Sequence, residues 1–103
     1  MILADDTRTL RVRDASDAVN SVEVSRAMLV GATLTRASFI KADLTGADLT
    51  DADLTEADLI GANLKGADLT RTNLTDADLT DADLTEAKLR TANLTGADLN
   101  RAK

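Results

Sequence analysis

Residues 42–51 read Ala-Asp-Leu-Thr-Gly-Ala-Asp-Leu-Thr-Asp, and this five-residue unit recurs without a break from Ala27 to Leu99. Alanine stands two places before the central residue of each unit, with Thr72 as the exception. We expect the central residues to form the core. They are Leu29, Leu34, Phe39, Leu44, Leu49, Leu54, Leu59, Leu64, Leu69, Leu74, Leu79, Leu84, Leu89, Leu94 and Leu99.

A period of five fits neither an α-helix nor a flat strand. On a helix, successive central leucines would lie about 140° apart and would form no apolar stripe. On a strand, an odd step would send every second leucine to the opposite face. The backbone must therefore turn once in each unit, so that alanine and leucine both point inward. A regular turn of one hand builds a solenoid.

The units Ala42–Gly46 and Ala47–Asp51, together with their successors, resemble the pentapeptide repeat proteins. The resemblance implies an all-β fold, a right-handed quadrilateral β-helix with four pentapeptides in each coil. Counted from Val24 to Leu99 there are sixteen central positions, which corresponds to about four coils.

Residues 1–21 lie outside the repeat, and we assign 22–103 to the solenoid. Thr9–Arg13 alternates polar and apolar residues, which is typical of a short half-buried strand. Such a strand can cover the exposed backbone edge of the first coil, as solenoid caps do. The alternative is an arm that reaches a neighbouring molecule.

The residue types exclude most catalytic chemistry. The 103 residues contain no cysteine and no histidine, so a zinc site, an imidazole acid or base and the usual nucleophile–base pairs are absent. We expect a single-domain protein that is not an enzyme and that has no cofactor, no metal and no catalytic residues. Weak calcium or magnesium binding by surface aspartates is the alternative to the absence of metal.

The sequence also predicts a cytoplasmic protein without membrane contact. No apolar run approaches the length of a membrane span, and Met1–Asp6 does not begin a signal peptide. The absence of cysteine suits a reducing compartment.

Charge is distributed unevenly along the chain, whose net charge is −6. Residues 42–86 include twelve acidic and two basic residues, whereas residues 87–103 include one acidic and four basic residues. The acidic part repels nucleic acid and can attract a basic partner. The candidate interaction surface consists of Asp48, Asp58, Asp68, Asp78 and Asp98.

The favoured function is a structural or protein-interaction module with this acidic surface. We expect the partner to be a protein, basic or DNA-binding, and we expect no direct contact with nucleic acid. The alternative is a DNA mimic that binds a type II topoisomerase, because the chain resembles pentapeptide repeat proteins that protect gyrase. A further interpretation is that Asp or Asn at this position simply forms turn hydrogen bonds and aids solubility.

Two smaller features are candidate contact sites. Ile40 and Ile60 point outward by register and share a column, so they form a possible apolar contact. At the other end, Leu84, Leu89, Leu94 and Leu99 have no apolar segment after them to cover them. We therefore predict association through this end, most simply as a two-fold homodimer.

Overall fold

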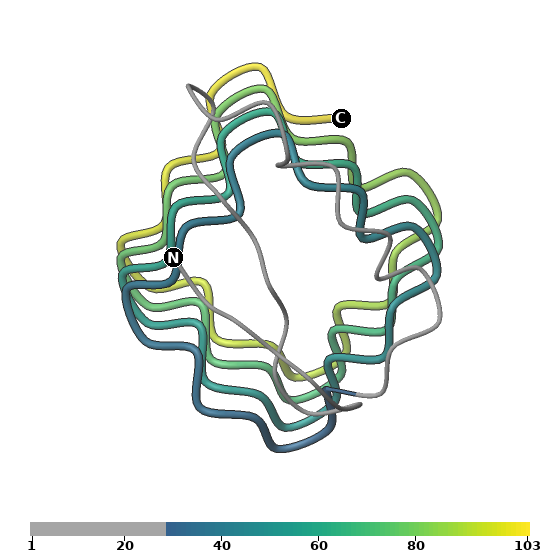
Figure 1. Cartoon of the computed structure of the whole chain (residues 1–103), viewed down its shortest axis with the longest axis vertical. Helices are drawn as coiled ribbons and strands as arrows, with labels where there is room; N and C mark the ends of the chain where they lie inside the picture. Colours follow the sequence, from purple (N-terminus) through teal and green to yellow (C-terminus); the bar gives the residue numbers. More distant parts are fainter. Residues whose placement is uncertain (1–28) are drawn as a thin grey trace.

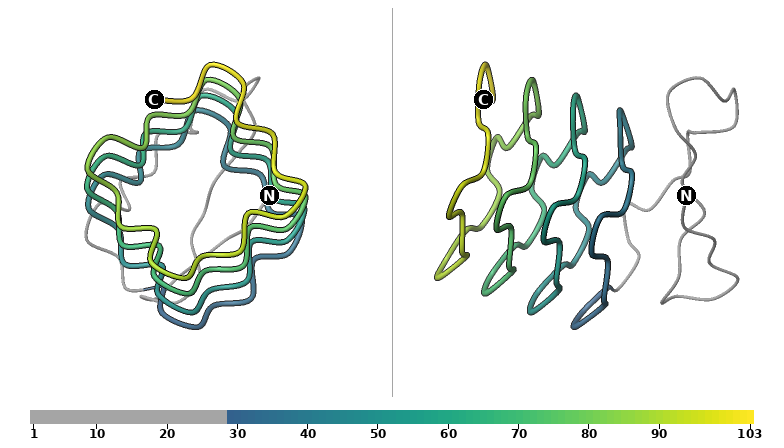
Figure 2. Two further views of the ribbon diagram at one scale, coloured as in Figure 1. Left: turned by 180° about the vertical axis from the view of Figure 1, so that it is seen from behind. Right: turned by 90° about the vertical axis from the view of Figure 1, so that its left-hand side faces the viewer.

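The computed structural model describes residues 29–103 of the chain. The predicted capping segment 1–21 and the expected start of the solenoid near Val22 lie outside the described residues. Viewed down the axis, the described part is a four-sided coil that follows the same outline in each turn (Figure 1). Viewed from the side, the turns are stacked on one another (Figure 2).

Adjacent coils are joined residue by residue in parallel register. Each bridge connects residues twenty apart, as in Asp58 with Asp78 and Asp78 with Asp98, so four pentapeptides complete one coil. The amide of Leu59 donates to the carbonyl of Asp78 at 2.7 Å, and the amide of Asp78 donates back to Ala57 at 2.9 Å. This is the bonding of a parallel bridge, in which Asp78 bonds to Ala57 and Leu59, the two residues on either side of its bridge partner Asp58.

The bridges are isolated, and residues 29–103 contain neither a helix nor a strand of several residues. The reason is the turn in every unit, which leaves only one residue per pentapeptide in the ladder. The predicted four-sided β-helix is thus present, built from single-residue bridges. The predicted total of about four coils includes residues before Leu29, so it stays a prediction.

Each corner of the coil is a tight turn. The carbonyl of Leu59 accepts a hydrogen bond from the amide of Ala62 at 3.0 Å, and the third residue of this turn, Gly61, has a φ of 66°. A positive φ at the third residue alone is the type II pattern. The same position has a positive φ throughout residues 29–103, at five glycines and ten other residues.

Leucine and alanine fill the narrow interior. Leucines from Leu29 to Leu79 are at most 2% exposed, and Phe39 and Ala62 are fully buried. Burial falls in the last coil, where Leu84, Leu89 and Leu94 are only partly buried. Leu99, which the repeat places among the core residues, is 43% exposed because no described coil covers it.

Candidate functional site

The candidate acidic residues lie in columns along the outside of the coil. Asp58, Asp78 and Asp98 are consecutive members of one column, and Asp48 and Asp68 belong to another, which Lys88 continues. Stacked strands are about 4.8 Å apart, so the carboxylates of a column recur at that spacing. All are partly buried except Asp98, which is exposed.

Most of these aspartates also serve the turn that follows them. Asp48 Oδ1 accepts hydrogen bonds from the amide of Thr50 at 3.1 Å and from its hydroxyl at 2.6 Å. Asp78 binds Thr80 in the same way, at 3.0 Å and 2.6 Å. Aspartate bound to the backbone two residues on is an Asx turn. One carboxylate oxygen of each is therefore used locally.

Asparagine performs this local role without a charge. Asn73 Oδ1 accepts from the amide of Thr75 at 3.0 Å and from its hydroxyl at 2.5 Å. At four aspartates, hydrogen bonds from the threonine two places on lower the carboxyl pKa. This lowering of the pKa affects Asp43, Asp53, Asp68 and Asp83.

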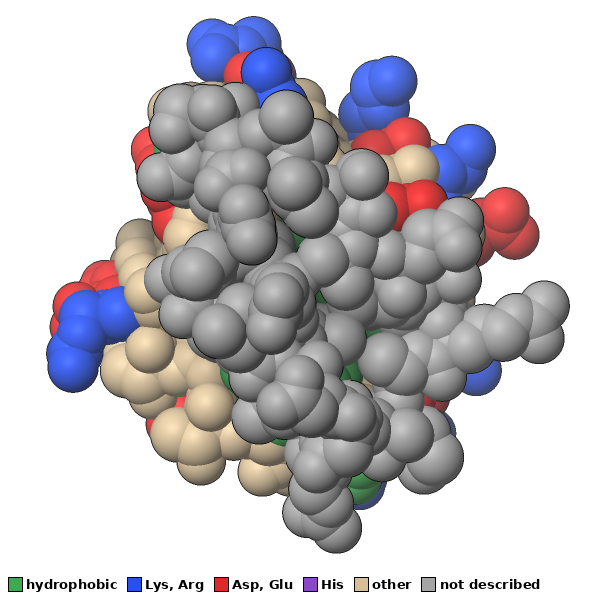
Figure 3. All heavy atoms as spheres, viewed as in Figure 1, with side chains coloured by type: hydrophobic (Ala, Val, Ile, Leu, Met, Phe, Trp, Pro, Cys, Tyr) green, Lys and Arg blue, Asp and Glu red, His purple; other side chains and the backbone are tan. Residues whose placement is uncertain are grey.

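Two arginines reach back one coil to aspartates at the corners. Arg71 binds Asp51 through Nε at 2.7 Å and Nη2 at 3.1 Å, and Arg101 binds Asp81 at 2.7 Å and 3.2 Å. These bonds lower the pKa of both aspartates and raise the pKa of both arginines. In the space-filling view, side chains of both signs project around the rim of the coil (Figure 3).

The candidate apolar contact is small. Ile40 and Ile60 are adjacent in one column, since the amide of Lys41 donates to the carbonyl of Ile60 at 2.8 Å, but both side chains are partly buried. Val30, at 43% exposure, is the more exposed aliphatic residue of this part of the chain.

At the predicted association end, apolar side chains and backbone donors are exposed together. Within residues 29–103, the amides of Leu89, Leu94 and Leu99 donate no backbone hydrogen bond, whereas the amide of Leu79 donates to Asp98 at 2.7 Å.

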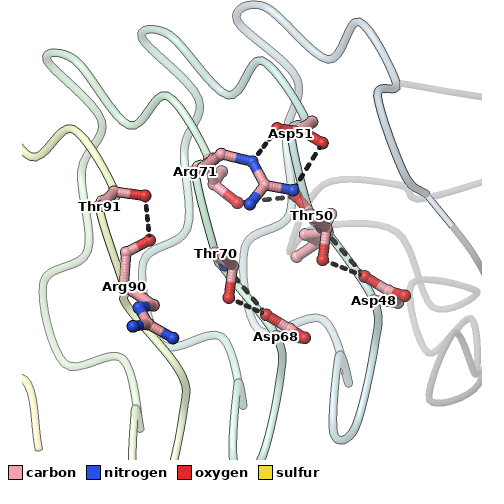
Figure 4. A network of polar contacts seen from close by, with 10 residues as sticks. Asp48, Thr50, Asp51, Asp68, Thr70, Arg71, Arg90 and Thr91 are labelled. Carbon is pink, nitrogen blue, oxygen red and sulfur yellow. Dashed lines mark hydrogen bonds and ion pairs between the residues drawn. The ribbon is translucent and has the colours of Figure 1, made fainter.

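Sequence reasoning missed a basic hollow between two successive coils. It has a volume of about 690 Å³, and its lining consists of Asp68, Thr70, Arg71, Lys88, Arg90 and Thr91. Residues 68–71 and 88–91 lie side by side there (Figure 4). The signal available in the sequence was Lys88, which follows Asp48 and Asp68 in their column.

Thr72, the one departure from alanine, lies next to this hollow in sequence. It is fully buried, and its hydroxyl donates to the carbonyl of Leu49 at 2.7 Å. The hydroxyl therefore has a partner inside the coil, as a buried polar group requires.

No metal or membrane feature emerges in the part of the chain that the structure describes. No three acidic side chains there are grouped so that they could hold a metal ion. Over residues 29–103 there is also no helix with the length and apolar character needed to cross a membrane.

The repeat matches a known family over most of the chain. The family model for pentapeptide repeats matches residues 22–55, 52–90 and 72–103. None of the curated proteins matches the chain.

Solved structures with the same coil share substantial sequence identity. HetL, a pentapeptide repeat protein involved in heterocyst differentiation regulation in Nostoc sp. strain PCC 7120, is 42% identical with a TM-score of 0.73. The match covers 74% of this chain and 35% of HetL. A pentapeptide repeat protein from the thylakoid lumen of Arabidopsis thaliana is 36% identical with a TM-score of 0.69.

That second match covers 71% of this chain and 51% of the Arabidopsis protein. The chain thus spans about a third to a half of the length of these two proteins. By its repeat, its twenty-residue coil and these matches, the chain belongs to the pentapeptide repeat family.

Proposed function

We propose that this chain is a non-enzymatic β-helix that binds a basic protein through its acidic columns. The contact residues are Asp48, Asp58, Asp68, Asp78 and Asp98. The supporting observation is that local hydrogen bonds hold the aspartates in place, as those from Thr50 to Asp48 do. A carboxylate that is already ordered loses less side-chain entropy when a partner binds.

The geometry leaves part of each carboxylate available. In Asp48 and Asp78, Oδ1 accepts the bonds from the turn, whereas Oδ2 accepts no hydrogen bond from the described residues. A row of such oxygens at the coil spacing suits lysine and arginine side chains on a flat partner surface. The binding should weaken with salt, because exposed charges are screened.

Asparagine variants test this proposal without disturbing the turns. Replacing Asp58, Asp78 and Asp98 together by asparagine keeps the side-chain oxygen that accepts from the backbone, as Asn73 does. We expect the variant to fold and to bind a labelled oligolysine peptide about tenfold more weakly than the parent chain. Equal binding by both proteins, measured by fluorescence anisotropy, would contradict the proposal.

The second candidate is a DNA mimic that binds a type II topoisomerase such as gyrase. It is favoured by the charge of the chain between residues 42 and 86, where twelve acidic residues accompany two basic ones. A DNA supercoiling assay with gyrase separates the candidates. The mimic is supported if the chain, at tens of micromolar, inhibits supercoiling by gyrase or protects gyrase against drugs, and if the asparagine variant loses this effect. Supercoiling that the chain leaves unchanged rules the mimic out.

We also propose association through the last described coil as a homodimer, with Leu84, Leu89, Leu94 and Leu99 at the contact. The exposure of Leu99 supports this. Leu99→Arg should shift the mass from light scattering to that of a monomer, whereas Asn100→Arg, at an exposed outward position, should not. A monomeric parent chain at high concentration would refute the proposed association.

A cytoplasmic location remains a prediction.

A further inference from the structure

The basic hollow includes two positions at which this chain departs from its own repeat. From Asp43 to Asp98, the residue before the central leucine is aspartate or asparagine in every unit except at Lys88. Arg90 is the one arginine that directly follows a central leucine in the same range. Architecture alone explains neither residue, because the neighbouring units form the same coil with uncharged or acidic residues there.

The backbone holds three cationic residues together at this place. Lys88 and Asp68 are bridge partners, and the amide of Leu69 donates to the carbonyl of Lys88 at 2.7 Å. The amide of Arg71 donates to the carbonyl of Arg90 at 2.9 Å, so these two side chains leave neighbouring points of adjacent coils. The cluster therefore follows from the register of the coil.

Two of the three cations form no ion pair with the described residues. The Arg71 guanidinium is bound to Asp51 by two hydrogen bonds (Figure 4). Lys88 and Arg90 form no ion pair with any residue between 29 and 103. Asp68 is the one carboxylate in the lining, and its Oδ1 is occupied by the amide and hydroxyl of Thr70.

The same face has the opposite character two coils before Lys88. The positions equivalent to Lys88, Arg90 and Thr91, forty residues upstream, hold Asp48, Thr50 and Asp51. Charge on this face therefore changes from acidic to basic along the axis, as Figure 4 shows from Asp48 across to Arg90. A ligand of the basic hollow must itself be negative, unlike the partner of the acidic columns.

We propose that this hollow binds an acidic peptide segment of a partner protein, with Lys88 and Arg90 binding its carboxylates. Arginine recognises carboxylates with two parallel hydrogen bonds, and a lysine beside it adds a point charge. The hollow has a volume of about 690 Å³, and its lining comes from two coils. Asp68 in this lining can accept a hydrogen bond from a backbone amide of the bound peptide. This goes beyond the proposed function, since it concerns another surface and a partner charge of opposite sign.

The test compares labelled oligoglutamate with the matched oligoglutamine peptide, by fluorescence anisotropy with the 103-residue chain. Oligoglutamate is a demanding probe because the whole chain has a net charge of −6 and repels it. We expect oligoglutamate to bind, oligoglutamine not to bind, and the binding to weaken as salt is added.

The key variant restores the repeat at the hollow. Lys88→Asp with Arg90→Thr recreates Ala-Asp-Leu-Thr, so it should fold, as circular dichroism will show. It should lower the affinity for oligoglutamate by about tenfold or more. The control Lys65→Thr also restores the repeat and removes a positive charge, but at an exposed residue outside the lining, and it should leave the affinity unchanged.

Several outcomes overturn the proposal. The first is that the parent chain does not bind oligoglutamate. The second is that the double variant binds oligoglutamate as tightly as the parent chain. The third is that Lys65→Thr loses as much affinity for oligoglutamate as the double variant does. Stronger binding of inorganic phosphate than of oligoglutamate would assign the hollow to a phosphate group instead. The asparagine variant of Asp58, Asp78 and Asp98 separates the two proposals, because it should lose oligolysine binding and retain oligoglutamate binding.

Discussion

At the scale of the residue, the turn position shows what a regular coil requires of its side chains. Among residues 29–103, ten residues other than glycine have a positive φ at this position, and Thr91 is one of them at 54°. The left-handed conformation costs an L-residue about 1–2 kcal/mol, and a β-branched residue is a clear outlier there. The chain therefore accepts local strain because the neighbouring coils determine the turn.

Thr91→Gly should stabilise the protein. Relief of about 1–2 kcal/mol of backbone strain exceeds the 0.4–1 kcal/mol, roughly, that glycine adds to the entropy of the unfolded chain. The free energy of unfolding in urea should thus rise by about 0.5–1 kcal/mol. Both variants lose one exposed hydrogen bond, from the Thr91 hydroxyl to the carbonyl of Arg90 and from the Thr95 hydroxyl to Asn93. The control Thr95→Gly, where φ is not positive, relieves no strain and should destabilise. A loss of stability in Thr91→Gly would show that its backbone is not strained.

The aspartates predict how stability depends on pH. Hydrogen bonds from Thr55 lower the pKa of Asp53 in the folded protein. A lowered carboxyl pKa contributes stability that is present above the unfolded value, about 3.9. That contribution is lost as the pH falls through the lower pKa of the folded state.

Asp53→Asn should therefore lower the melting temperature slightly at neutral pH, where the carboxylate contributes stability, and flatten its fall below about pH 4. The amide oxygen can still accept from Thr55, as Asn73 accepts from Thr75. Asp53→Ala removes the acceptor and should cost about 1 kcal/mol at neutral pH. If Asp53→Asn and the parent chain have the same acid profile, the carboxyl pKa is not lowered.

At the scale of the element, the pentapeptide divides into inward positions that set the coil and outward positions that vary. Alanine is needed opposite leucine because the cross-section of the coil is narrow, and Ala62 is accordingly fully buried. Small-to-large changes in a filled core force side chains out of their rotamers and shift the backbone.

Ala62→Leu should destabilise by about 1–3 kcal/mol or more. Ala102→Leu is a matched control, because Ala102 lies two coils further along the same corner and is only partly buried. It should cost much less, since its side chain borders solvent. Thermal unfolding followed by circular dichroism compares the two variants, and equal losses would argue against a size limit inside the coil.

The period of five predicted a solenoid, because it fits neither a helix nor a flat strand, and the resemblance to pentapeptide repeat proteins implied its four sides. Spacing also predicted that Asp58 and Asp78 share a column, once four units were assigned to each coil. The hollow could not be predicted in the same way. The shape of the hollow depends on the conformations of long side chains, which the repeat does not determine. Arg71, for example, pairs with Asp51 although Asp68 is also close enough to affect its pKa.

At the scale of the whole molecule, stability is distributed along the axis. Each coil contacts only the coils before and after it, so the stability of a solenoid is approximately a sum of local and neighbour contributions. A central leucine with coils on both sides should therefore matter more than the equivalent leucine with a described coil on one side only. Leu59 and Leu99 form such a pair, since they share a column and are 0% and 43% exposed.

Leu59→Ala should cost about 2–5 kcal/mol, because it removes a fully buried side chain and leaves a cavity between two coils. Leu99→Ala should cost less than about 1.5 kcal/mol, because much of its side chain is already hydrated. Urea unfolding of both variants measures the difference at dilute protein concentration. If concentrating the protein raises the cost of Leu99→Ala towards that of Leu59→Ala, a second molecule buries Leu99. If the cost stays low at every concentration, Leu99 remains exposed and the proposed association through this end is wrong.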